Sequence, residues 1–240
     1  MALSNDSRDR VKGAFEPIAL AMGRAGLTPD ALTLIGFLIT AAGAVILSQQ
    51  QWLLGGLVVL AGGVFDMFDG TLARATGRAS RLGAFLDSVF DRAGEIVVYL
   101  GLIAGLQAFG VADGPLLAAT AMGTAVMVSY TRSKSEGLGF TAGTGMAAVG
   151  VMPREVRLVI LSIGLVAAGL LGAYPGQAFD CDASFLMPID CGPFSSGIGA
   201  LFIALGIIAV GSLITTIQRV VHVRNQARQQ ASSQPTENVT

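Results

Sequence analysis

The chain alternates long apolar runs with short polar connections. Six of these runs are long enough to cross a bilayer, because about 20 apolar residues in a helix span its hydrocarbon core. We expect six transmembrane helices, at residues 30–48, 53–75, 82–107, 114–134, 155–174 and 195–224. The pattern therefore predicts an all-α integral membrane protein.

The residues before the first run follow a different pattern. Between residues 8 and 24, Val11, Phe15, Ile18 and Met22 recur at helical spacing, and charged residues mark the opposite side. This is typical of an amphipathic helix at the membrane interface, although an ordinary packing helix has the same pattern.

These patterns divide the chain into three parts. Residues 1–25 form the N-terminal interfacial segment, residues 26–226 the six-helix membrane domain, and the polar residues 227–240 a disordered cytoplasmic tail. At the start of the domain, Thr28 suits the N-cap of the first spanning helix and Pro29 suits its first position.

The distribution of charge predicts the orientation. Of the 240 residues, 52% are hydrophobic and 13% are charged, and with six spans all 15 basic residues lie on the side of the N-terminus. The positive-inside rule then places both termini in the cytoplasm of a multi-pass cell-membrane protein. Because basic residues interleaved with aromatic ones are absent from the sequence, we do not expect nucleic acid as a partner.

Both cysteines, Cys181 and Cys191, lie in the connection between the last two predicted spans. The orientation makes this loop extracytoplasmic, where a disulfide can persist. A structural bridge is therefore expected, with two unrelated thiols as the alternative.

Four aspartates gather where the second predicted helix ends and the third begins. Asp66 and Asp69 are three residues apart and Asp87 and Asp91 four apart, so each pair shares a helical face. A charge inside a membrane costs roughly 2.5–3.5 kcal/mol or more, so such residues usually serve a function. Oxygen ligands suit Mg²⁺ or Mn²⁺, and two such ions could bridge phosphates in an in-line displacement. Incidental Asp–Arg pairing is the alternative, but the nearby arginines are too few.

These residues also carry a family resemblance. Residues 66–91 read D-x₂-D-G-x₂-A-R-x₈-G-x₃-D-x₃-D, which resembles the signature of the CDP-alcohol phosphatidyltransferases at every position. The resemblance implies a metal-dependent enzyme, commonly a homodimer, that transfers a phosphatidyl group from CDP-diacylglycerol and releases CMP.

The same resemblance implies roles for individual residues. Asp66, Asp69 and Asp87 would hold two Mg²⁺ or Mn²⁺ ions, and Asp91 would be the general base and would also reach a metal. The residues around the CDP-lipid would be Pro29, Asp30, Gly70, Arg74 and Ser80.

Further segments are similar to the prokaryotic phosphatidylinositol-phosphate synthases of this family. They nominate four residues for the phosphate of the acceptor, inositol 1-phosphate: Arg132, Lys134, Arg157 and Arg219. Converging cations fit a phosphorylated polyol, whereas snorkelling at the interface is the alternative for each of them and for Arg154.

Two other functions remain open at this point. Glycerol 3-phosphate fits the same cations, so a phosphatidylglycerophosphate synthase is the near alternative. A divalent-cation or proton-coupled transporter is the remote one, because intramembrane carboxylates also mark ion paths.

Overall fold

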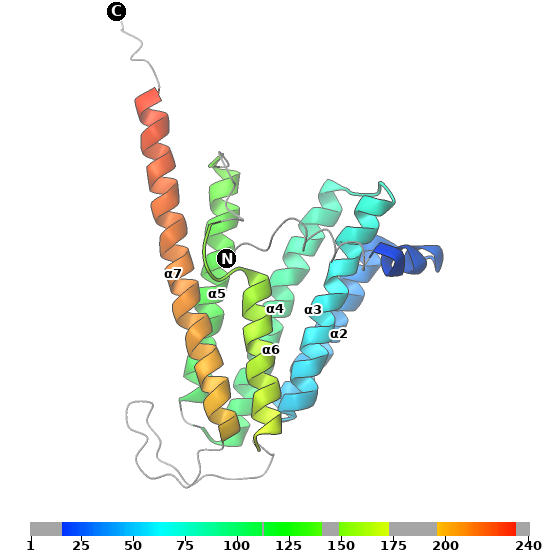
Figure 1. The fold of residues 1–240 in the computed structure, drawn as a ribbon, viewed down its shortest axis with the longest axis vertical. Coiled ribbons are helices and arrows are strands. Elements are labelled where there is room, and N and C mark those ends of the chain that lie inside the picture. Colours follow the sequence, from blue (N-terminus) through cyan, green and yellow to red (C-terminus); the bar gives the residue numbers. More distant parts are fainter. Residues whose placement is uncertain (1–15, 112, 141–148, 173–195, 234–240) are drawn as a thin grey trace, which may run out of the picture.

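The computed structural model of the chain describes residues 16–111, 113–140, 149–172 and 196–233. These residues contain no strand, and their long helices match the six predicted apolar runs one to one (Figure 1). A shorter helical segment, residues 16–24, precedes them. The long helices are α2 (Pro29–Ser48), α3 (Trp52–Ala75), α4 (Arg81–Phe109), α5 (Gly114–Gly137), α6 (Arg154–Leu170) and α7 (Ser196–Ser233).

Local capping signals define the helix ends that matter for the site. Thr28 is the N-cap of α2, as predicted: its hydroxyl accepts a hydrogen bond from the N–H of Ala31, and Pro29 lies in the first turn. Ser80 caps α4 in the same way, accepting from the N–H of Gly83 at 2.9 Å. The short connection between α3 and α4 therefore begins the fourth helix close to where the third one ends.

The prediction of a disordered tail over residues 227–240 is wrong for residues 227–233. Helix α7 continues to Ser233, so residues 227–233 are helical, and only residues 234–240 lie outside the described part. The reason is local, because Gln, Ala and Arg in this stretch are good helix formers despite their polarity. The predicted Cys181–Cys191 bridge also lies outside the described residues.

The long helices form a ring in which each packs against two others. The main contacts run from α2 to α3, α6, α7, α5 and α4, and from α4 back to α2. Successive helices alternate in direction (Figure 1). As a result, the C-terminal ends of α3, α5 and α7 lie at the same end of the ring as the N-terminal ends of α2, α4 and α6.

The hydrophobic core fills the other end of this ring. It includes Leu47 at the end of α2, Trp52 at the start of α3 and Leu106 near the end of α4, together with buried residues from α5, α6 and α7. A smaller cluster of Ala19, Leu32, Phe68 and Leu72 lies near the α3–α4 turn. The apolar packing therefore leaves the space between these clusters to polar side chains.

Glycines let α2 approach its two neighbours closely. A Cβ added at Gly62 on α3 would lie 3.1 Å from the backbone nitrogen of Thr40 on α2, and one added at Gly101 on α4 would lie 2.7 Å from the carbonyl carbon of Ala44 on α2. Small residues at such contacts are typical of membrane helix packing. They hold α2 against the acidic faces of α3 and α4.

The N-terminal segment packs by part of its predicted apolar face. Ala19 is buried and Met22 packs against the Leu32–Leu72 cluster, but Ile18, predicted on the apolar face, is 48% exposed. The described helix begins only at residue 16, so Val11 and Phe15 lie outside the described residues.

The outer surface of the ring is apolar. Large exposed side chains include Leu38, Val45, Ile163, Ile203 and Val210. Among the described residues, three helices are long and apolar enough to cross a bilayer: Pro29–Ser48, Trp52–Ala75 and Gly197–Ser232. Helix α4 carries several charges and α6 has only 17 residues. The chain is therefore an all-helical membrane protein.

The close approach of α2 and α4 can be tested at Gly101. A Cβ there would lie 2.7 Å from the carbonyl carbon of Ala44, so Gly101→Ala should destabilise the protein by roughly 1–3 kcal/mol through overpacking. Thermal unfolding in detergent, followed by circular dichroism, should show a lower midpoint.

Gly123 provides the matched control for this substitution. It is an exposed position inside α5, where an added Cβ meets no heavy atom within 4 Å in the described part of the chain beyond its own helix. Gly123→Ala should leave the midpoint unchanged or raise it, because alanine is the better helix former by up to about 1 kcal/mol. Equal midpoints for the two variants would contradict the proposed tight contact.

Candidate metal and nucleotide site

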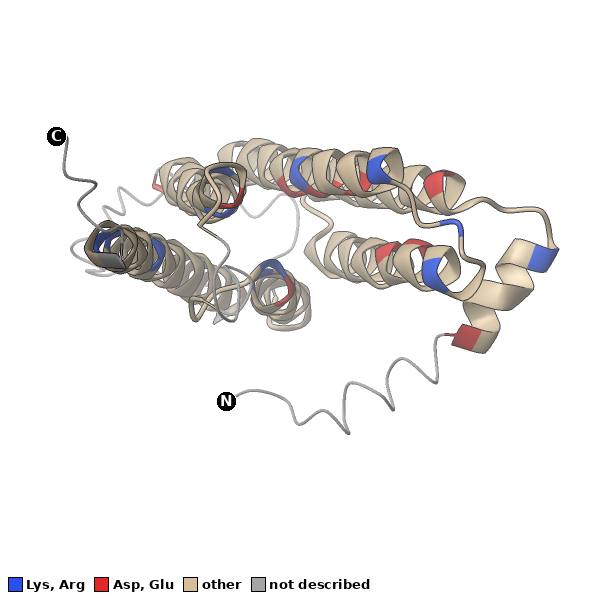
Figure 2. Ribbon diagram, turned by 90° about the horizontal axis from the view of Figure 1, so that it is seen from above, with Lys and Arg blue, Asp and Glu red and all other residues tan. Residues whose placement is uncertain are grey.

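The structure brings together three of the four predicted aspartates. One carboxylate oxygen each of Asp66, Asp69 and Asp87 lies within 4.8 Å of the other two. Asp66 and Asp69 come from the C-terminal half of α3, and Asp87 comes from the second turn of α4. In the end-on view of Figure 2, acidic positions on neighbouring helices face one another across the space between them. The i,i+3 spacing and the short α3–α4 turn together produce this arrangement.

Asp69 is the most firmly held member of the triad. It is 6% exposed, and the hydroxyl of Thr33 on α2 donates a hydrogen bond to its Oδ2 at 2.5 Å. The backbone N–H of Gly70 also contacts its Oδ1. Two donors therefore orient this carboxylate, and one of them comes from a third helix.

Asp91 lies one turn beyond Asp87 on α4 and is not part of the triad. Its Oδ1 forms an ion pair with Nη1 of Arg154 at 2.6 Å. The same nitrogen lies 2.9 Å from Oδ2 of Asp66. Arg92 makes a longer contact of 3.4 Å to the other oxygen of Asp91. The first residue of α6 thus links the two acidic pairs.

The donor set fits a divalent cation. Three carboxylates converge at a distance that one hard cation could bridge, and their ligand atoms are all oxygens. Within the described part of the chain, only Arg154 and Arg92 form ion pairs with the four aspartates, which leaves negative charge to be neutralised. Such an excess is costly in a membrane protein unless a cation binds.

A pocket of about 200 Å³ opens directly beside the triad. All five residues predicted to surround the CDP-lipid line it: Pro29, Asp30, Gly70, Arg74 and Ser80. Asp69 and Asp87 form part of its wall. The first turns of α2 and α4 also border it, and the partial positive charge of helix N-termini favours phosphate groups there.

The four predicted acceptor residues are brought together only in part. Lys134 on α5 and Arg219 on α7 line one groove of about 180 Å³. Arg132 instead forms an exposed pair with Glu136, 2.9 Å apart. Arg219 also donates to the backbone carbonyls of Val149 and Val128, so part of its guanidinium supports the fold.

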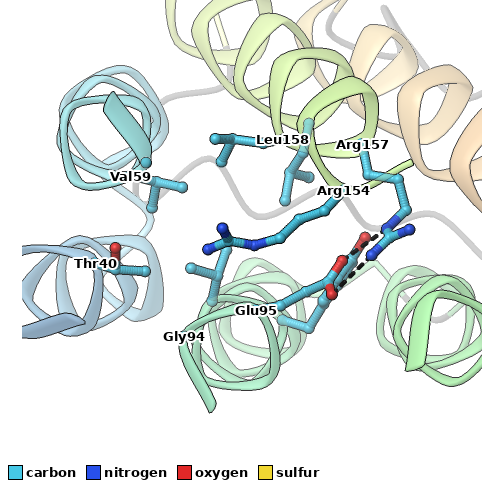
Figure 3. Close-up of a pocket in the computed structure, with 11 residues that line it drawn as sticks. Thr40, Val59, Gly94, Glu95, Arg154, Arg157 and Leu158 are labelled. Atoms are coloured by element: carbon cyan, nitrogen blue, oxygen red, sulfur yellow. Dashed lines mark hydrogen bonds and ion pairs between the residues drawn. The ribbon is translucent and has the colours of Figure 1, made fainter. Parts of the chain in front are cut away.

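Arg157 is held inside the ring. Its side chain is 2% exposed and forms a bidentate pair with Glu95, with distances of 2.8 and 2.9 Å, and its Nη1 donates to the carbonyl of Met152 at 3.0 Å. Figure 3 shows this pair beside Arg154, whose side chain extends from α6 toward Thr40 and Val59. In this structure Arg157 neutralises an internal carboxylate, which differs from the expected role of an acceptor ligand.

Three residues of the site were not assigned to it from the sequence. Glu95 follows Asp91 by four residues, so the i,i+4 rule applied once more along α4 would have found it. In the sequence, Arg154 is one of several basic residues at the predicted interface. Its partner Asp66 lies 88 positions away, so the pairing leaves no local signal. Thr33 lies in an apolar run, where a single hydroxyl is not informative.

Comparison with known sequences agrees with this geometry. The family model for CDP-alcohol phosphatidyltransferase matches residues 26–218. The phosphatidylinositol phosphate synthase of Streptomyces avermitilis is 36% identical over 229 residues, which cover 93% of this chain and 83% of that protein. The archaetidylinositol phosphate synthase of Pyrococcus horikoshii is 36% identical over 168 residues, covering 70% of this chain and 85% of that protein.

The fold of this chain is also similar to that of solved structures. A crystal structure of Mycobacterium tuberculosis phosphatidylinositol phosphate synthase with CDP-DAG bound matches with a TM-score of 0.69 at 30% identity, covering 87% of this chain and 92% of that one. The same synthase in complex with manganese and citrate also gives 0.69 at 30% identity, with 88% of each chain covered. The chain therefore belongs to the CDP-alcohol phosphatidyltransferase family.

Proposed function

We propose that this enzyme transfers the phosphatidyl group of CDP-diacylglycerol to a hydroxyl of inositol 1-phosphate, giving phosphatidylinositol phosphate and CMP. The proposal rests on one observation: the aspartate triad and the neighbouring pocket share two residues, Asp69 and Asp87. Support for the acceptor comes from two relatives at 36% identity whose names both specify an inositol phosphate lipid.

The triad supplies the ligands for the metal. Asp66, Asp69 and Asp87 would hold Mg²⁺ or Mn²⁺, and Asp91 would contribute to a second ion. When bound, the two ions neutralise the diphosphate and the charge that develops on it during transfer. Thr33 keeps Asp69 in place for this role through its hydrogen bond.

The pocket beside the triad would bind the CDP part of the lipid. Arg74 and the N-terminal turns of α2 and α4 face the diphosphate, while Pro29, Asp30, Gly70 and Ser80 surround the nucleotide. A guanidinium and helix N-termini suit this ligand because both favour negative charge. The diacylglycerol chains would extend to the apolar outer surface of the ring.

Asp91 is the proposed proton acceptor. As the hydroxyl oxygen of the acceptor bonds to the β-phosphorus, its proton passes to Asp91, and the bond from this phosphorus to the oxygen of CMP breaks. Asp91 is the aspartate outside the triad and lies one helical turn from it. A carboxylate in this position can accept the proton without giving up the ligands of the first ion.

The phosphate of the acceptor would be held by cations from α5, α6 and α7. Arg132 lies on the same helix as Lys134, and Arg157 lies on α6, which packs against α7. Lys134 borders the same groove as Arg219. Like charges gathered in this way are favourable once an anion with several acceptor oxygens binds among them.

In the membrane, each of the six long helices spans the bilayer of the cell, and the aspartate site faces the cytoplasm. The alternating helix directions and the bias of basic residues toward one end support this arrangement. Residues 1–25 lie at the interface, residues 26–226 form the transferase domain, and residues 227–240 form the cytoplasmic tail. The resemblance to the family supports a homodimer.

The decisive experiment measures CMP release from CDP-diacylglycerol by the purified protein with Mg²⁺. Inositol 1-phosphate, glycerol 3-phosphate and free inositol are offered in separate reactions. Release that requires inositol 1-phosphate is expected. Release with glycerol 3-phosphate alone would make the protein a phosphatidylglycerophosphate synthase, and no release with any acceptor would refute the proposed activity.

Replacing the proposed base should stop the reaction without weakening the binding of CDP-diacylglycerol. Asp91→Asn should lower the turnover number at least about a hundredfold, the lower end of what general base catalysis contributes. Binding of CDP-diacylglycerol, measured by calorimetry, should remain close to that of the wild type. Turnover near that of the wild type would rule out Asp91 as the base.

Asp69→Asn provides the contrast within the same site. Asp69 lines both the triad and the pocket, so this variant should lose Mn²⁺ binding and CDP-lipid binding together with activity. Identical binding defects in the Asp69 and Asp91 variants would show that Asp91 serves as a ligand and not as a base.

The acceptor groove can be tested at Lys134, which borders it together with Arg219. Lys134→Ala should raise the KM for inositol 1-phosphate about tenfold or more, the effect of losing one charge-assisted hydrogen bond. The KM for CDP-diacylglycerol should not change.

Arg224→Ala is the matched control, because Arg224 is an exposed cation on α7 that does not border this groove. It should leave both KM values unchanged. An equal rise in the acceptor KM for both variants would indicate a general charge effect, and no rise for Lys134→Ala would remove this residue from the acceptor site.

A further inference from the structure

Arg154 contacts two aspartates with a single nitrogen. Its Nη1 lies 2.6 Å from Oδ1 of Asp91 and 2.9 Å from Oδ2 of Asp66. These aspartates come from α4 and α3, and Arg154 is the first residue of α6. A positive charge supplied by the chain itself therefore joins the triad, through Asp66, to the aspartate outside it.

We propose that Arg154 is an internal counter-ion that competes with the second divalent ion for Asp66 and Asp91. The guanidinium holds the two carboxylates together until that ion replaces it, whereas an ion bound by the triad leaves Arg154 in place. This inference rests on the metal dependence included in the proposed function. It predicts two unequal binding events at a site whose carboxylates are otherwise similar.

The count of charges favours replacement over coexistence. Asp66, Asp69, Asp87 and Asp91 carry four negative charges, and Arg154 and Arg92 form ion pairs with this group. One divalent ion and the two arginines bring the sum to zero. A second divalent ion then leaves one excess positive charge if Arg154 departs and two if it stays in contact. Because like charges repel strongly in a partly buried site, Arg154 and the second ion exclude each other.

The structure also offers the displaced side chain a place to go. A cavity of about 40 Å³ lies beside Arg154 and is lined by Glu95, Tyr99 and Thr40 among others. Figure 3 shows Arg154 reaching across this cavity, with Glu95 close to its stem. Glu95 already accepts two hydrogen bonds from Arg157, but an ionised carboxylate has about four acceptor positions. It can therefore take part of the charge of Arg154.

The exchange would couple metal loading to the chemistry. While Arg154 is bound, one oxygen of Asp91 is occupied by the guanidinium at 2.6 Å. When the second ion replaces Arg154, the other carboxylate oxygen of Asp91 would face the acceptor hydroxyl. Arg154 is thus a positioning residue, since it acts through Asp66 and Asp91 and not on a substrate.

The test is a Mn²⁺ titration of the full-length protein in detergent, with free Mn²⁺ followed by electron paramagnetic resonance. The wild type should bind one ion tightly and a second more weakly. Arg154→Gln should tighten the weaker event about tenfold or more, the factor that corresponds to one lost charge-assisted contact, and should leave the tighter event little changed. Weaker or unaltered binding of the second ion would overturn the proposal.

Arg92→Gln is the matched control, because Arg92 also contacts Asp91 but at 3.4 Å and without reaching Asp66. It removes the same charge and should change the second affinity by less than about threefold, as expected for a longer contact to one aspartate only. A gain equal to that of Arg154→Gln would attribute the effect to net charge and overturn the proposal.

Arg154→Lys keeps the inference testable if the glutamine variant does not fold. The shorter side chain retains its charge but should compete less well, so the second ion should bind more tightly than to the wild type, by a smaller factor than with glutamine. No gain with lysine would count against the proposal. A wild-type protein that binds no Mn²⁺ would instead refute the metal dependence in the proposed function.

Discussion

Four carboxylates held close together inside a membrane protein are the constraint on which the rest of this structure depends. Each costs several kcal/mol to remove from water, and their mutual repulsion adds to that cost. The chain offsets part of it with the hydroxyl of Thr33 on Asp69 and with the guanidinium of Arg154 on Asp66 and Asp91. The remaining negative charge is what gives the site its affinity for divalent cations, so complete compensation by the protein would remove the function.

The helix packing explains how these groups can be held so close together. Glycines at positions 62 and 101 let α3 and α4 pack closely against α2, and Thr33 of α2 lies next to Asp69. The ring order then puts α6 beside α3, so that its first residue reaches the acidic faces. The larger apolar core occupies the opposite end of the ring, so the polar site lies apart from most of the buried apolar packing.

Much of this site could be predicted from the sequence because its signals are local. The i,i+3 and i,i+4 spacing of the aspartates, the short turn before Ser80 and the cap at Thr28 depend on a few neighbouring residues. The structure brings Asp66, Asp69 and Asp87 together beside the predicted pocket and leaves Asp91 outside the triad. The pair Arg154–Asp66 depends on α3 and α6 being neighbours in the ring, whereas the pair Arg157–Glu95 joins α6 to α4 across the ring. A periodic pattern shows which face of a helix is polar, but it does not show which other helix that face meets.

The acids of α4 show how one helix can serve both substrates. Asp87, Asp91 and Glu95 follow one another at intervals of four residues and so share one face. Asp87 belongs to the triad, Asp91 pairs with Arg154, and Glu95 pairs with Arg157. Arg154 and Arg157 lie three residues apart on α6, so α4 and α6 face each other with charges in matching order. A shift of α6 relative to α4 would change the pairing of both arginines at once, so these ion pairs across the ring are the physical link between the aspartate site and the proposed acceptor site.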